Sequence, residues 1–256
     1  MTSPIPKEIP DLPAVPGRSR LRPGVVPPAA VMAPAYRPVA ATYRLLVAAA
    51  AGASVSVDLL LGSPVRVLTF FTIQANVLAA LVFTLSALRA GSARRPLPAL
   101  VTGGTLFYTL IAALVYHVLL VNEPGTLSMT GHPDAPTGWP ALANQVMHTL
   151  VPVAALLDWL LLTRPGPLSL RHAKAWLLYP IAYLALTLVR GELIPPDREG
   201  RYLYPFLNVE RLGYRSVLAN ALLVGLAFFT VAVLLVALDH IRPDPTRRRS
   251  KTGFRL

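Results

Sequence analysis

The sequence predicts an all-α protein, a polytopic bundle of six transmembrane helices. Three observations lead to this fold class. Hydrophobic residues make up 54% of the 256 residues and charged residues only 14%, against about 25% in a soluble domain. Several apolar runs approach the length of about 20 residues that a helix needs to cross a bilayer. The basic residues gather in the tails and loops beside these runs.

Composition also excludes some kinds of function. The chain has no cysteine, which excludes disulfides and thiolate metal sites, and we expect no metal and no other cofactor. A net charge of +12 would suit a nucleic-acid-binding protein. Basic residues that flank apolar spans are explained better by membrane topology, so we expect no nucleic-acid partner.

The chain divides into three regions. Residues 1–37 are rich in proline and arginine and contain no apolar segment long enough for a signal peptide, so we expect a disordered cytoplasmic tail. Residues 38–239 form the transmembrane domain, with Pro152 as a predicted kink, and residues 240–256 form a second basic tail. The six spans are predicted over residues 39–61, 67–88, 98–121, 141–162, 174–194 and 214–238.

Lysine and arginine predict the orientation, because they collect on the cytoplasmic side of a membrane. With both termini in the cytoplasm, 18 of the 24 basic residues lie on the inner side and six on the outer side. This bias predicts a multi-pass protein of the plasma membrane with both tails inside. Arginine far outnumbers lysine, and alanine and proline are abundant, which indicates a GC-rich bacterial source.

The second span carries the most informative residues. Residues 66–88 are apolar enough to cross a bilayer, yet the first half contains Thr69, Thr72, Gln74 and Asn76. At about 100° per residue, Thr69, Thr72 and Asn76 share one face of a helix, and Gln74 points elsewhere. A polar stripe in hydrocarbon must face protein or water, so this face marks the inside of the bundle.

Polar residues of other spans are predicted at the same depth. At 1.5 Å per residue, Thr69 lies about 3 Å and Asn76 about 13 Å inside the outer boundary. The inner halves of the spans are almost entirely apolar. Four spans therefore predict one outward-facing polar pocket. The band contains Thr69, Thr72, Asn76, Tyr116, His117, Asn144, His148, Thr187 and Arg190.

The fourth span contributes Asn144 and His148, which lie at i and i+4 and share a face. A histidine within a span indicates a functional site, and the alternative is a histidine that only bonds a neighbouring helix. Ordinary roles also compete for Thr69, whose hydroxyl can bond the preceding turn, and for His117, which suits interfacial anchoring. The outer loop over residues 195–213 is either an interfacial belt or a lid.

Two motifs of this band resemble a known family. LTFFTIQAN (68–76) in the second span and NQVMHTLVP (144–152) in the fourth resemble the androgen-induced-gene family of six-span membrane proteins and their bacterial relatives. YLYPFLNV (202–209) is also similar, and the likeness covers the spans but not the tails. Animal members hydrolyse fatty-acid esters of hydroxy fatty acids with a threonine in span two and a histidine in span four. The resemblance therefore implies Thr69 as nucleophile and His148 as its partner.

The chain also departs from that family. The animal pattern has an acidic residue near position 72, where this chain has Thr72, and it has no counterpart for Gln74 and Asn76. The bacterial members look like a distinct branch.

The sequence leaves two candidate functions, which belong to different classes. The first is an intramembrane lipid-ester hydrolase, in which neutral His148 deprotonates Thr69 and a fixed donor stabilises the oxyanion. Its partner is a membrane lipid or acyl ester. The alternative is a non-enzymatic small transporter or lipid-binding component with an outward-facing polar cavity. The pocket residues expected are Thr72, Gln74, Asn76, Tyr116, His117, Asn144 and Arg190.

A third idea is haem held between His117 and His148. It requires both imidazole rings to face a common iron.

Overall fold

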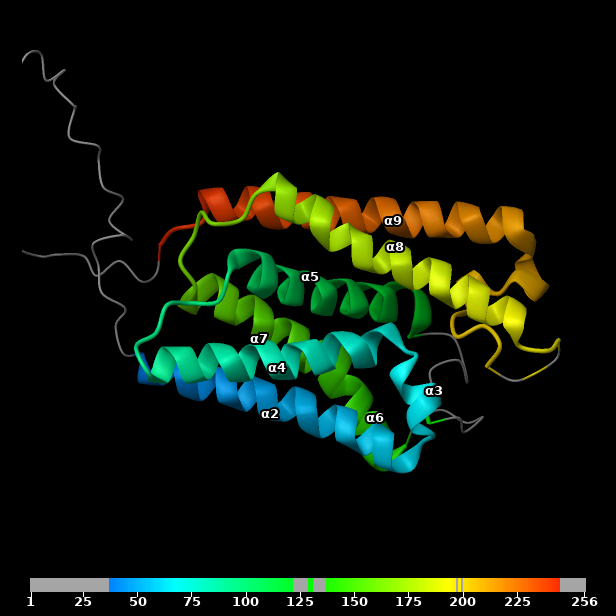
Figure 1. Cartoon of the computed structure of the whole chain (residues 1–256), viewed down its shortest axis with the longest axis horizontal. Helices are drawn as coiled ribbons and strands as arrows, with labels where there is room; N and C mark the ends of the chain where they lie inside the picture. Colours follow the sequence, from blue (N-terminus) through cyan, green and yellow to red (C-terminus); the bar gives the residue numbers. More distant parts are fainter. Residues whose placement is uncertain (1–36, 122–128, 131–136, 197, 199, 245–256) are drawn as a thin grey trace, which may run out of the picture. The chain divides into compact units, whose positions relative to one another are not determined.

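The computed structural model describes residues 37–121, 129–130, 137–196, 198 and 200–244. Most of the two predicted tails lies outside these residues, and so does the predicted disorder of the N-terminal tail. Within the described part all regular structure is helical and no strand occurs. The predicted all-α fold class is confirmed, and Figure 1 shows the long helices running side by side.

The long helices match the six predicted spans. All six are long and apolar enough to cross a membrane, and two of them combine shorter α-helical and π-helical segments. The elements are α2 (Pro38–Leu61), α3 (Pro64–Leu68), α4 (Phe71–Gly91), α5 (Ala99–Val115), η1 (Tyr116–Leu120), α6 (Gly138–Gln145), η2 (Val146–Leu150), α7 (Val151–Leu157), η3 (Asp158–Leu162), α8 (Leu170–Leu193), η4 (Pro205–Leu207) and α9 (Val209–Ile241).

The fifth and sixth spans begin four and five residues earlier than predicted, for local reasons. Helix α8 begins at Leu170, because Ser169 and His172 form a reciprocal capping box at its N-terminus. Helix α9 begins at Val209, but Gly213 interrupts it with a φ of 75°. The predicted start at residue 214 is therefore the residue after this kink.

The second span is not one continuous helix, which corrects the prediction for residues 67–88. Helix α3 ends at Leu68, Phe70 is extended with φ −76° and ψ 132°, and α4 begins at Phe71. The hydroxyl of Tyr183 in α8 forms hydrogen bonds with the backbone groups at this break. It donates to the carbonyl oxygen of Thr69 at 2.8 Å and accepts from the backbone N–H of Phe71 at 3.1 Å. Thr69 thus lies outside the helix that carries Thr72 and Asn76.

The end of the bundle at which α5 and α8 begin packs around Trp176. Its indole N–H donates to the carbonyl oxygen of Leu100 at 2.9 Å, and its ring stacks on Phe107. Two glycines, Gly103 and Gly104, give the ring its space: a Cβ on Gly103 would lie 2.6 Å from the indole. This contact fixes α8 against α5.

The opposite end of the bundle has its own apolar cluster, which the loop between α8 and α9 completes. Leu203, Tyr204 and Leu207 of this loop are buried together with Phe70 and Met147 of the spans. Burial raises the pKa of the Tyr204 hydroxyl well above its ordinary value. The loop therefore covers this end of the bundle.

The Gly103 contact gives a stability prediction. Gly103→Ala places a methyl group against the Trp176 ring, so we expect a loss of about 1–3 kcal/mol in the free energy of unfolding, as is usual for overpacking. Gly225→Ala in α9 is the matched control, because a Cβ there meets no atom within 4 Å. Thermal unfolding of the purified protein in detergent measures both. Equal midpoint temperatures for the two variants would contradict this packing.

Candidate functional site

A buried contact between Thr72 and His148 lies at the centre of the candidate site. Thr72 is on the first turn of α4, and His148 is on η2 of the fourth span. The Thr72 hydroxyl oxygen lies 3.0 Å from Nε2 of His148. His148 is only 1% exposed, so the contact is sealed from solvent.

The hydrogen bonds of His148 indicate its tautomer. Nδ1 lies 3.0 Å from the carbonyl oxygen of Asn144, which only accepts, so Nδ1 carries the proton. In the neutral ring Nε2 is then the acceptor, and the Thr72 hydroxyl donates to it. A hydroxyl donates to a histidine, and the histidine is oriented by a third group, which is the arrangement of an activated nucleophile.

Two asparagines and a tyrosine enclose this pair. The amide of Asn76 donates to the carbonyl oxygen of Thr72 at 2.9 Å and lies 3.5 Å from that of Met147. The amide of Asn144 donates to the hydroxyl of Tyr116 at 2.9 Å. The Tyr116 ring stacks on the imidazole of His148 with centroids 4.2 Å apart.

Two buried polar atoms of these side chains have no hydrogen-bond partner among the described residues. They are the side-chain oxygens of Asn76 and Asn144. Buried acceptors are nearly always hydrogen-bonded in native proteins, because leaving one unpaired costs about 1–3 kcal/mol. Two unpaired acceptors beside one histidine therefore favour a ligand-binding or catalytic site over a contact that only pairs helices.

Two of the cluster's residues, Tyr116 and His148, lie on π-helical turns. Such turns are rare in proteins as a whole, but those that occur are often found at functional sites. Pro152, which follows η2, has no backbone N–H to continue the π-helical pattern to Met147. The Asn76 amide lies at the carbonyl that this proline leaves free. The hydrogen bonding thus changes beside Pro152, the residue predicted to kink the span.

The structure brings together five of the predicted site residues from three spans. This group, which we name the Thr72 cluster, consists of Thr72, Asn76, Tyr116, Asn144 and His148.

Thr69, the nucleophile that the resemblance implies, is not in the Thr72 cluster. Its hydroxyl donates to the carbonyl oxygen of Arg66, one turn back along the chain. Thr69 lies before the break in the second span, and the hydroxyl that reaches His148 is that of Thr72.

The other predicted residues make their hydrogen bonds outside the Thr72 cluster, although the His117 ring contacts that of Tyr116. Gln74 donates to the carbonyl oxygen of Leu68 at 2.8 Å and accepts from Tyr179. His117 is exposed and contacts the hydroxyl of Thr149 at 3.1 Å. Arg190 donates to the carbonyl oxygens of residues 200 and 201 at 2.9 and 3.0 Å, so it holds the loop between α8 and α9.

Two tyrosines of α8 were not predicted from sequence. Tyr179 bonds Gln74, and Tyr183 bridges the break that positions Thr72. Their spacing of i and i+4 places both on one face of α8, but aromatic residues are so common in spans that this pattern alone indicates no role.

The ring nitrogens of His148 also bear on the haem hypothesis. Both nitrogens lie at hydrogen-bonding distance from Thr72 or Asn144, and neither is directed at an iron shared with His117. His117 itself turns toward Thr149. The described geometry therefore does not fit a bis-histidine haem site.

An apolar groove of about 450 Å³ begins beside the Thr72 cluster. It lies between α2 and the η2–α7 part of the fourth span. Thr149, the residue after His148, lines one end, and Tyr43 and Leu157 line the other. Large apolar side chains such as Leu46 and Val153 form its walls, 66% and 52% exposed, so the groove faces the surrounding lipid.

Fold and site together define an integral membrane protein: six apolar helices that enclose one buried polar cluster. Comparison with protein-family models, curated proteins and solved structures finds no match. The resemblance in the second and fourth spans therefore stays a prediction from the motifs.

The tyrosine at the helix break gives a second prediction. Tyr183→Phe removes the hydroxyl that serves both Thr69 and Phe71, so we expect a loss of about 1–3 kcal/mol in unfolding free energy. Tyr214→Phe, whose hydroxyl bonds only the exposed Glu192 among the described residues, is the control and should cost less. Thermal unfolding in detergent compares them. If the two variants lose equal stability, the Tyr183 hydroxyl does not hold the break.

Proposed function

We propose that the protein is an intramembrane lipid-ester hydrolase in which Thr72 is the nucleophile and His148 the general base. The observation that carries this proposal is the 3.0 Å contact from the Thr72 hydroxyl to Nε2 of a histidine whose Nδ1 faces a carbonyl oxygen. A threonine hydroxyl is a weak nucleophile until a base accepts its proton, and neutral histidine does this near pH 7.

The reaction follows from these positions. Thr72 Oγ1 attacks the ester carbonyl carbon while its proton passes to Nε2 of His148. The tetrahedral intermediate collapses, the C–O bond to the alcohol breaks, and His148 returns the proton to the leaving oxygen. Water then attacks the acyl-threonine ester with His148 again as base, releasing the fatty acid and restoring Thr72.

Stabilisation of the oxyanion is available at the start of α4. The helix begins at Phe71, so the N–H groups of Thr72 and Ile73 belong to a first turn, which has no intrahelical acceptors, whereas the N–H of Phe71 already donates to Tyr183. The positive end of the helix dipole also lies there. Donors fixed beside the nucleophile are worth about 2.7–4 kcal/mol each in other acyl-transfer enzymes.

The Thr72–His148 pair is buried in this structure, so a side chain must move before a substrate can reach it. Tyr116 stacks on the imidazole and is itself 5% exposed. Displacing its ring would open one face of His148 and would free its hydroxyl from Asn144. The closed state keeps water away from the nucleophile until a lipid enters.

Hydrolysis of fluorogenic acyl esters by the purified protein tests the assignment. Thr72→Ala and His148→Ala should each lower kcat/KM by about 10²- to 10⁴-fold, the range for loss of acid–base chemistry. Thr69→Ala is the matched control and should retain activity, because its hydroxyl bonds Arg66 instead. Loss of activity in Thr69→Ala alone would move the nucleophile to Thr69, and full activity in both Thr72→Ala and His148→Ala would reject the mechanism.

A lipid-binding protein without hydrolytic activity is the second candidate, and the burial of the cluster favours it. Asn76 is 0% and His148 1% exposed, as expected of a network that joins helices. A fluorophosphonate probe separates the two functions. A hydrolase is labelled on the peptide that contains Thr72, whereas a binding protein with a purely structural network is not labelled and loses stability in Thr72→Ala.

We further propose that the protein lies in the plasma membrane with both termini in the cytoplasm. The distribution of the 24 basic residues supports this orientation. Because the chain has no cysteine, single-cysteine variants report sidedness directly. In intact cells, a membrane-impermeant maleimide should label Arg198→Cys and not Ser92→Cys. The opposite labelling would invert the topology.

A further inference from the structure

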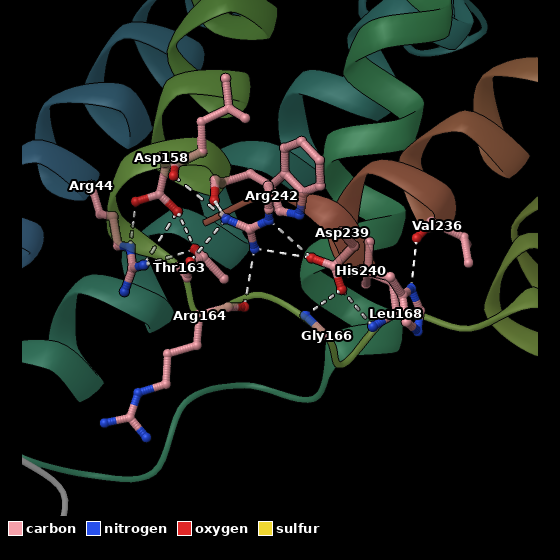
Figure 2. Close-up of polar contacts among 12 residues, drawn as sticks. Arg44, Asp158, Thr163, Arg164, Gly166, Leu168, Val236, Asp239, His240 and Arg242 are labelled. Atoms are coloured by element: carbon pink, nitrogen blue, oxygen red, sulfur yellow. Dashed lines mark hydrogen bonds and ion pairs between the residues drawn. The ribbon is translucent and has the colours of Figure 1, made fainter. Parts of the chain in front are cut away.

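Arginines gather at the end of the bundle where α2 begins and η3 and α9 end (Figure 2). Arg44 pairs with Asp158 through a 2.8 Å contact, and Asp158 also accepts from the hydroxyl of Thr163. Arg242 pairs with Asp239 at 2.9 Å. Asp239 in turn accepts from the backbone N–H groups of residues 166 and 168. Both aspartates are therefore fully engaged in holding this end together.

Two further arginines at this end, Arg37 and Arg164, form no ion pair with a carboxylate of the described residues. Arg37 donates to the carbonyl oxygen of Leu162 at 2.7 Å, which uses one of five N–H donors. The Arg164 guanidinium is drawn in Figure 2 without a contact to the residues shown there, and the residue is exposed. Burial and the nearby charge of Arg44 lower the pKa of Arg37; Arg164 adds to this effect, and Asp158 and Asp244 oppose it. An anion bound here would oppose the repulsion from Arg44 and Arg164 in the same sense as Asp158 and Asp244 do.

The apolar groove reaches this same end. Its residues Tyr43 and Leu157 directly precede Arg44 and Asp158, the two members of the ion pair. The Tyr43 hydroxyl donates to the carbonyl oxygen of Ala154 at 2.9 Å and joins the two walls. A surface that is cationic at one end and apolar along its length matches a phospholipid in both charge and shape.

We propose that this surface binds an anionic phospholipid, with its phosphate at Arg37 and Arg164 and one acyl chain in the groove between α2 and α7. Guanidinium groups suit phosphate because their N–H donors match its oxygens. Basic pockets between spans on the cytoplasmic side of a membrane protein are typical sites for anionic lipid headgroups. The groove lies within the spanning segments, where the only solvent is lipid.

This lipid site is distinct from the Thr72 cluster. Asp158 lies ten residues beyond His148 in the fourth span, which is about 15 Å along a helix. A lipid whose phosphate is held near Asp158 therefore keeps its ester bonds at that end and directs its chain toward Thr149. The lipid is a bound ligand and not the substrate of the proposed reaction, so it does not depend on the hydrolase assignment.

Lipid titration of the purified full-length chain tests the proposal. Phosphatidylglycerol added in neutral detergent should raise the midpoint of thermal unfolding more than phosphatidylcholine does. Arg37→Gln/Arg164→Gln should weaken phosphatidylglycerol binding at least about tenfold, at about 1 kcal/mol for each arginine. Arg198→Gln/Arg211→Gln, at the opposite end, is the control and should bind as the wild type does. Ala50→Phe, which fills the groove, should lower the amount of lipid retained in native mass spectra.

Several outcomes overturn the proposal. Equal stabilisation by both lipids means that the surface contacts lipid without recognising its charge. An equal shift with inorganic phosphate means a site for free anions. Unchanged binding in the double variant places the lipid elsewhere. If loss of the Arg37 contact with Leu162 prevents folding, the single variant Arg164→Gln decides, because this exposed guanidinium makes none of the contacts drawn in Figure 2.

Discussion

The constraint that shapes this protein is that hydrocarbon offers no hydrogen bonds. Every polar group placed within the spans must find its partner in the protein. The Thr72 cluster meets this demand by drawing polar side chains from α4, from the fourth span and from η1 of the third span. Each of its contacts joins different turns or helices, so the cluster fixes how these spans pack. Among the described residues, the amide oxygens of Asn76 and Asn144 and the indole N–H of Trp159 are exceptions, and the two oxygens adjoin the histidine whose chemistry we propose.

Local departures from ideal helix geometry carry this arrangement. The second span breaks at Phe70, so α4 starts anew just before Thr72 and presents a helix N-terminus to the site. The third and fourth spans change to π-helical turns where Tyr116 and His148 occur. Tyr183 stabilises the break from α8. At the other end, Arg242 donates to the carbonyl oxygens of residues 163 and 164 at 3.0 Å and caps the chain where η3 ends. Irregular backbone occurs where side chains satisfy its polar groups.

Much of this fold was predictable, because span length and hydropathy depend on local composition. The six spans follow from apolar runs, and the meeting of Thr72, Asn76, Asn144 and His148 follows from helical spacing and equal depth. The identity of the partner hydroxyl was not predictable. A continuous helix places Thr69 and Thr72 on one face, and only the break at Phe70, held by a tyrosine from a distant span, separates them. The resemblance to a known family implies Thr69, whereas the geometry places Thr72 at the histidine.

The central claim is that the Thr72 hydroxyl donates to Nε2 of a neutral His148. Solid-state NMR of the protein with ¹⁵N-labelled histidine, reconstituted in lipid, measures this directly, with His148→Gln assigning the signal among the five histidines. The account predicts a ring protonated at Nδ1, with an Nε2 signal that moves in Thr72→Val and stays in place in Thr69→Val. A ring protonated at Nε2, or an Nε2 signal that Thr72→Val leaves unchanged, would contradict it.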